Sequence, residues 1–231
     1  MKRIHILLAV QSLVAILVSV NRLGTWTLGY VLPNEFLRWV DLNNMLVLPL
    51  ISIVAFYLLK KVIEGNSSAL VSRQHLWVNL MFIVGIYLLA ASYGTHEVTN
   101  YMHARFCLED SSSDLCRIVI FNDDEFSHWV FFSGFVMVNA ALLFLQALFA
   151  QKELVSRSDS LILMFNALFL AAGIVANLGF EEIGLDLYVV GLLAVLSSYL
   201  LWKRGKQPLF IYYTFAYWVG LVASVGLQMA R

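Results

Sequence analysis

Three of the five histidines stand close to acidic residues in one stretch of the chain. His96 precedes Glu97, and His128 follows Asp124 by four positions and Glu125 by three. Imidazole and carboxylate groups bind divalent metal ions and transfer protons. Because such groups are costly at membrane depth, they are often functional where they occur. The stretch therefore predicts a metal-binding or proton-handling site.

The spacing of these residues predicts two helix faces that meet. One face carries four polar residues separated by four, four and three positions, namely Ser92, His96, Asn100 and His103. The next helix runs in the opposite direction. If His128 lies at the depth of His96, a rise of about 1.5 Å per residue places Asn100 opposite Asp124.

The residue types predict a divalent metal ion, zinc or iron, because both accept imidazole and carboxylate ligands. His103 lies about 10 Å from His96 along a regular helix, so we assign it to a second site beside the ion. Glu125-x-x-His128 has the spacing of carboxylate-bridged di-iron helices, although Glu97-x-x-Asn100 offers an amide where a second histidine is needed. The predicted ligands are His96, Asn100, Asp124, Glu125 and His128, with His103 beside them.

A metal ion here predicts an integral membrane enzyme, a hydrolase or an oxidoreductase, that acts on a lipid or another hydrophobic small molecule. Glu97 and Glu182 are the carboxylates predicted to transfer protons in that reaction. Two alternatives stay open. Asp123 and Asp124 can cap the start of a helix, which makes the cluster structural. The chain can also be a non-enzymatic transporter, ion-binding sensor or assembly subunit.

Apolar helices must position this cluster. Of the 231 residues, 61% are hydrophobic and 13% charged, against about 45–50% and 25% in soluble domains. This composition excludes a soluble globule and a disordered chain, and the zero net charge gives no reason to expect a nucleic-acid partner. We predict an all-α integral membrane protein, one domain over 1–231, with a bundle of seven transmembrane helices. The apolar runs are 4–20, 45–63, 76–94, 127–150, 160–178, 186–202 and 208–229.

The first run follows a basic start and could be a signal peptide. No cleavage site of small residues follows it before Asn21, so we interpret it as a helix.

The distribution of charged residues predicts the orientation of the helices across the membrane. With the N-terminus inside, the inner segments hold ten of the fifteen basic and three of the fifteen acidic residues, a net charge of +7. The outer segments hold the other five basic and twelve acidic residues, a net charge of −7. Cytoplasmic loops of membrane proteins are enriched in Lys and Arg. The split predicts an N-in, C-out topology in a bacterial inner membrane, with membrane lipids as partners.

The segment 21–44 is too polar to cross a membrane. Pro33-Asn34-Glu35 is typical of a helix start, and the apolar side chains of Phe36 and Trp39 follow it. We predict a short interfacial helix between the first two spans.

Cys107 and Cys116 are the only cysteines, and both lie between the third and fourth spans. A pair confined to the non-cytoplasmic side favours a structural disulfide in an oxidising compartment. A redox-active thiol pair is the alternative, but the CxxC spacing is missing.

Ser92-x-x-x-His96 with a later Asp124 resembles the intramembrane hydrolases of the ceramidase and adiponectin-receptor superfamily. The resemblance covers three positions. Those enzymes also carry an HxxxH pair on the last helix, which 210–230 lacks, so their activity is not transferred to this chain. A rhodopsin-like function is excluded because 212–230 contains no lysine for a retinal Schiff base.

Overall fold

The computed structural model describes residues 1–65, 72–109, 111–151, 155–180 and 184–230. Every regular element within these ranges is a helix, and short π-helical segments, labelled η, lie in line with three of the longer helices. In chain order the elements are α1 (Lys2–Leu23), α2 (Trp39–Leu42), η1 (Asn43–Val47), α3 (Leu48–Glu64), α4 (Arg73–Met102), η3 (His103–Cys107), α5 (Asp114–Ile120), η4 (Phe121–Phe126), α6 (Ser127–Leu148), α7 (Arg157–Phe180), α8 (Gly184–Arg204) and α9 (Pro208–Ala230). The predicted all-helical fold class is confirmed.

Within the described residues, seven helical stretches are long and apolar enough to cross a membrane, which confirms the predicted number. Two of them exceed the predicted apolar runs by the widest margin. Arg73–Cys107 and Asp114–Leu148 each contain 35 residues, which corresponds to about 52 Å of helix, whereas a hydrocarbon core is about 30 Å thick. The paired ends of these two helices therefore extend well beyond the other spans. We call this part of the molecule, made of η3, α5, η4 and the adjoining last turns of α4, the α5 end.

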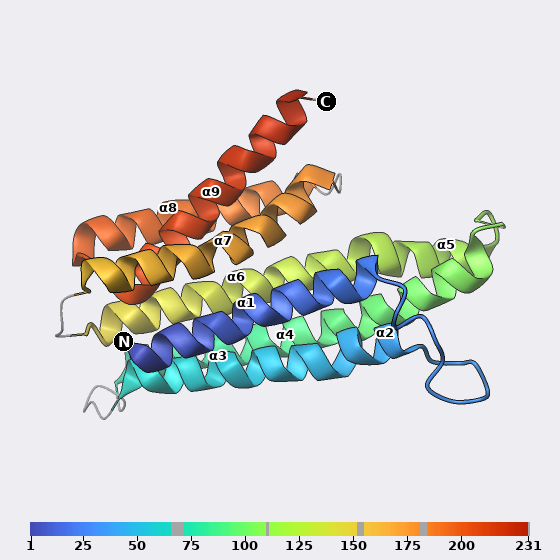
Figure 1. Ribbon diagram of the computed structural model, residues 1–231, viewed down its shortest axis with the longest axis horizontal. Coiled ribbons are helices and arrows are strands. Elements are labelled where there is room, and N and C mark those ends of the chain that lie inside the picture. The colour runs from blue at the N-terminus through green and yellow to red at the C-terminus, as the bar shows by residue number, and fades with distance from the viewer. Residues whose placement is uncertain (66–71, 110, 152–154, 181–183, 231) are drawn as a thin grey trace.

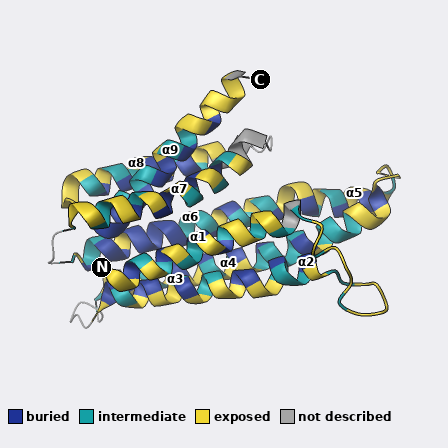
Figure 2. Ribbon diagram, viewed as in Figure 1, coloured by how far each residue is buried: buried dark blue, intermediate teal, exposed yellow. Residues whose placement is uncertain are grey.

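The helices form two groups that pack side by side (Figure 1). In the first group, α1, α3, α4 and α6 run with similar axes, and α4 and α6 contact one another along most of their length. In the second, α9 packs on α7 and α8, and its C-terminal half diverges from the first group. Buried residues are most continuous along α6, the helix of the first group that also packs against α8 and α9 of the second (Figure 2). α6 is therefore the central helix of the core.

A disulfide joins Cys107 at the end of η3 to Cys116 in α5, with a Cα–Cα distance of 5.4 Å. The predicted pairing is confirmed. Since the bond links the extended ends of α4 and α6 across a short loop, it restricts how far they can separate.

The predicted interfacial helix with its start at Pro33-Asn34-Glu35 is wrong. The chain from Gly24 to Arg38 is instead a non-helical loop closed by an antiparallel bridge between Tyr30 and Arg38. Glu35 has a positive φ of 58°, which no helix accommodates. The helix begins only at Trp39, where the Asp41 carboxylate accepts hydrogen bonds from the Arg38 backbone and side chain.

Two glycines allow α4 and α6 to pack closely. A Cβ atom at Gly134 would lie 2.7 Å from the backbone nitrogen of Leu89, and one at Gly85 would lie 2.8 Å from the backbone nitrogen of Val138. Backbone atoms cannot move aside as a flexible side chain can. The α4–α6 contact, which positions the α5 end, therefore requires glycine at both sites.

We predict that Gly134→Ala destabilises the protein by about 1–3 kcal/mol, because the added methyl group overpacks the α4–α6 contact. Gly94→Ala in α4 is the matched control, because a Cβ atom there meets nothing within 4 Å. Thermal unfolding in detergent measures both variants. Equal melting temperatures for the two would show that the helices are not packed this closely.

Candidate metal centre at the α5 end

The α5 end is built from one uninterrupted helix on each side. Ser113 caps the start of α5 by accepting a hydrogen bond from the backbone N–H of Cys116, and the helix continues through η4 and α6 to Leu148. Asp123 and Asp124 therefore lie inside a helix. The interpretation of these two residues as a helix cap is wrong. The apolar run 118–121 before them was the sequence signal that the helix starts earlier.

The π-helical segment η4 decides which acidic residue faces α4. A π-turn contains more residues than an α-turn, so it rotates the positions that follow it relative to a regular helix. Within η4, Asp123 is 1% exposed and faces α4, while Asp124 and Glu125 are exposed. Sequence spacing placed Asn100 opposite Asp124, but in the structure Asn100 contacts Asp123. Asp123 is the site residue that sequence reasoning missed.

Two histidines meet the two oxygens of the Asp123 carboxylate. His96 Nδ1 lies 2.9 Å from Oδ1, and His103 Nδ1 lies 3.0 Å from Oδ2. The Asn100 side chain donates a longer hydrogen bond of 3.4 Å to Oδ2. His103 thus shares one carboxylate with His96, although its position along the helix suggested a separate site.

Two serines extend the contact towards the middle of the bundle. Ser92 Oγ donates a hydrogen bond of 2.8 Å to the backbone carbonyl of Ser127, whose own hydroxyl donates to the carbonyl of Asp123 at 2.7 Å. The predicted polar face of α4 is therefore confirmed, because each of its four members contacts η4 or the start of α6. Those members are Ser92, His96, Asn100 and His103.

The innermost contact of this cluster is a single buried pair. His96 Nδ1 and Asp123 Oδ1 are both buried and lie 2.9 Å apart, and neither atom has a further hydrogen-bond partner within the described part of the chain. Burying a carboxylate is costly, so such an oxygen gains from every additional partner. A cation that binds both atoms would supply one.

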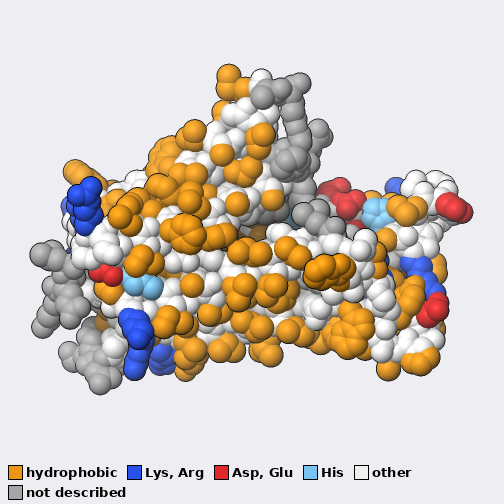
Figure 3. All heavy atoms as spheres, viewed as in Figure 1, with side chains coloured by type: hydrophobic (Ala, Val, Ile, Leu, Met, Phe, Trp, Pro, Cys, Tyr) orange, Lys and Arg blue, Asp and Glu red, His pale blue; other side chains and the backbone are white. Residues whose placement is uncertain are grey.

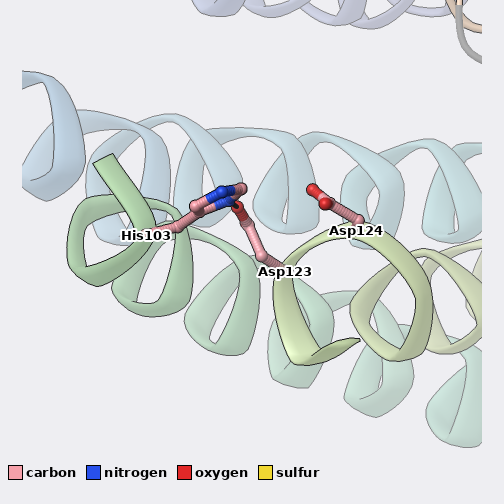
Figure 4. Close-up of side chains that lie close together, drawn as sticks. All are labelled: His103, Asp123 and Asp124. Atoms are coloured by element: carbon pink, nitrogen blue, oxygen red, sulfur yellow. Dashed lines mark hydrogen bonds and ion pairs between the residues drawn. The ribbon is translucent and has the colours of Figure 1, made fainter. Parts of the chain in front are cut away.

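Asp124 completes a group that can hold an ion. One atom each from His103, Asp123 and Asp124 lies within 4.8 Å of the others. Figure 4 shows the side chains of His103 and Asp123 directed towards one another, with the Asp124 carboxylate beside them. In a tetrahedral zinc site the bond lengths require neighbouring ligand atoms to be about 3.3 Å apart.

The remaining predicted residues lie in different places. The His128 ring is 5.1 Å from the His96 ring, which confirms that these histidines lie at the same depth. Glu125 is exposed and does not belong to the group of three. Glu97 is 3% exposed and lines a separate cavity on another face of α4. Glu182 lies outside the described residues.

The other two histidines also pair with acids, at the opposite end of the molecule. His5 Nε2 lies 2.7 Å from Asp159, and His75 Nε2 lies 2.7 Å from Glu64. A histidine–carboxylate pair is therefore not distinctive by itself in this protein. The α5 end differs because one buried carboxylate meets two imidazoles and a second carboxylate lies beside it.

Comparison with protein-family models, with curated proteins and with solved structures finds no match to this chain.

We predict that Asp123→Ala lowers the free energy of unfolding by about 1–3 kcal/mol when chelator is present, because His96, His103 and Asn100 lose their shared acceptor. Asp124→Ala should change it by less than about 0.5 kcal/mol, because that side chain is exposed. Denaturant unfolding in micelles measures both variants. A stable Asp123→Ala protein would contradict the central role of this carboxylate.

Proposed function

We propose that this chain is an integral membrane protein that binds one divalent metal ion, zinc or iron, at the α5 end. We further propose that it uses the ion to transform a lipid or another hydrophobic substrate at the outer leaflet. The observation that carries the proposal is the Asp123 carboxylate, which is buried, contacts two imidazoles and lies beside the carboxylate of Asp124.

The chemistry of the cluster supports a metal ion. Two imidazoles with one or two carboxylates are a ligand set that zinc and iron both accept. Asp123 can either bind the ion directly or hold the Nδ1 atoms of His96 and His103, so that Nε2 of each ring binds it. Carboxylates orient histidine ligands in this second way in many zinc sites. In both arrangements Asp124 supplies a carboxylate at the exposed side.

A bound ion would act as a Lewis acid or lower the pKa of a coordinated water molecule. The exposed Asp124 and Glu125 carboxylates are close enough along η4 to accept a proton at that side of the site. Substrate would approach from the exposed side, because Asp123 closes the site towards α4.

The distribution of charge supports a membrane position with the N-terminus inside. Figure 3 shows hydrophobic side chains over the middle of the visible face and Lys and Arg side chains grouped at the end with the N-terminus. Asp and Glu side chains, with some Arg, lie at the α5 end. Cytoplasmic loops favour Lys and Arg, so the α5 end would be the outer end.

A structural role for the cluster is the second candidate. It is favoured by the bonds from Asn100 and His103, which already satisfy Oδ2 of Asp123 without an ion. The two functions differ in Asp124, since this exposed carboxylate matters for an ion but not for packing.

We expect purified protein, loaded with Zn²⁺ or Fe²⁺ and desalted, to retain one ion per chain, as measured by mass spectrometry of the metal. His103→Ala, Asp123→Ala and Asp124→Ala should each lose most of it, because each removes a group that holds the ion directly or orients its ligands. His5→Ala is the matched control, because its imidazole pairs with an acid at the opposite end.

Chelator should also lower the melting temperature of the parent, because an ion that binds only the folded state stabilises it. If the parent carries no ion and its melting is unchanged by chelator, the cluster is structural and the metal-dependent function is refuted.

For the topology, we predict that a fluorescent protein that fails to fold in the periplasm gives no signal when fused after Arg231 in a bacterial host. The same reporter fused before Met1 should fluoresce, because the basic N-terminal end stays in the cytoplasm. Fluorescence from the C-terminal fusion would place the C-terminus in the cytoplasm and would refute the predicted topology.

A further inference from the structure

The face of α4 that carries Glu97 lines a cavity of about 350 Å³. The loop 24–38 and the start of the α2–α3 helix enclose its other sides. Nearly all of its surface is apolar. The apolar side chains in its lining are Phe36, Leu37, Met45, Val98, Met102 and Phe106.

The loop that covers this cavity is fastened to α4 at one point. The backbone carbonyl of Glu35 accepts hydrogen bonds from the Tyr101 hydroxyl, at 2.8 Å, and from the Arg105 guanidinium. Glu35 is also the residue with positive φ, so the loop turns where α4 holds it. These bonds therefore hold the loop in place over the cavity.

The charges around the cavity largely cancel. Asp41 is buried in the lining and forms two hydrogen bonds of 2.8 Å with the Arg38 side chain. These bonds raise the pKa of Arg38 above its usual range. Arg38 also lies over the Tyr101 ring, 4.8 Å from its centre. The lining also contains Glu97 and Arg105, whose formal charges are opposite. With Asp41 paired to Arg38 and a surface that is nearly all apolar, the cavity favours an uncharged, apolar occupant.

The surroundings of the cavity indicate where that occupant comes from. Trp26 and Phe36 of the covering loop are large apolar residues that are exposed. Met45 lies where the second predicted apolar run begins, so the cavity lies at the level where hydrocarbon meets headgroups. Its volume is near the lower limit of about 300–1,000 Å³ for ligand pockets, which suits one chain better than a whole two-chain lipid.

We propose that this cavity binds one acyl chain of an outer-leaflet phospholipid. The inference rests on the proposed membrane location, and it deepens the proposed function by naming the substrate class. His96 faces Asp123, and the next residue, Glu97, faces the cavity. Successive residues differ by about 100° around a helix, so α4 presents the metal centre and the chain-binding cavity on adjoining faces.

Photolabelling tests this proposal. The full-length protein is reconstituted in phosphatidylcholine vesicles that contain a phosphatidylcholine with a diazirine on one acyl chain. After irradiation, mass spectrometry quantifies labelled peptides. We expect the segments 36–45 and 97–106 to be labelled in the parent. Val98→Trp should reduce that labelling several-fold, because the indole fills the cavity.

Val84→Trp is the matched control. Val84 and Val98 both lie on α4 and are 43% and 49% exposed, but Val84 does not line the cavity. The second pair of variants is Leu37→Asp and Leu32→Asp. The first places a charge in the cavity lining, and the second places a charge in the same loop but outside the lining. Melting temperatures confirm that each variant is folded.

Equal labelling of Val98→Trp and Val84→Trp, or of Leu37→Asp and Leu32→Asp, would overturn the proposal. The experiment is run with chelator present, so its outcome does not depend on a bound ion. If labelling follows the proposal but metal analysis finds no ion, the cavity binds lipid and the metal-dependent reaction alone is refuted.

Discussion

The α5 ends of α4 and α6 are held in register by the contact between the Asp123 carboxylate and the imidazoles of His96 and His103. Asp123 is almost fully buried, so its charge must be compensated by neighbouring groups. Those neighbours all come from one face of α4. These short contacts therefore fix the position of α4 relative to η4. The disulfide between Cys107 and Cys116 closes the same pair of helices at their tips.

This constraint depends on close packing further along the same helices. Gly85 and Gly134 bring the α4 and α6 backbones into contact, and Ser92 bonds to the carbonyl of Ser127 just before the cluster begins. Each contact constrains how far α4 and α6 can shift along their axes or rotate at the next contact. Two helices much longer than a hydrocarbon core would otherwise be free to separate beyond the membrane.

The proposed metal centre and the proposed lipid-binding cavity share one helix. A substrate chain in the cavity would lie against Glu97, one residue from His96. Glu97 was selected from the sequence as a carboxylate that handles protons, and it is buried beside this apolar cavity.

The sequence by itself determined the seven apolar helices, the polar face of α4, the common depth of His96 and His128 and the disulfide. These features follow from local periodicity, chain direction and the small number of cysteines. Only the tertiary structure selected Asp123 instead of Asp124, and only it replaced the predicted interfacial helix by the loop 24–38. The reason is physical: a π-helical segment rotates one side chain into the core and its neighbour out of it, and a bridge such as Tyr30–Arg38 joins residues across a turn. Both depend on contacts with other elements, which the hydrophobic pattern of a single segment does not encode.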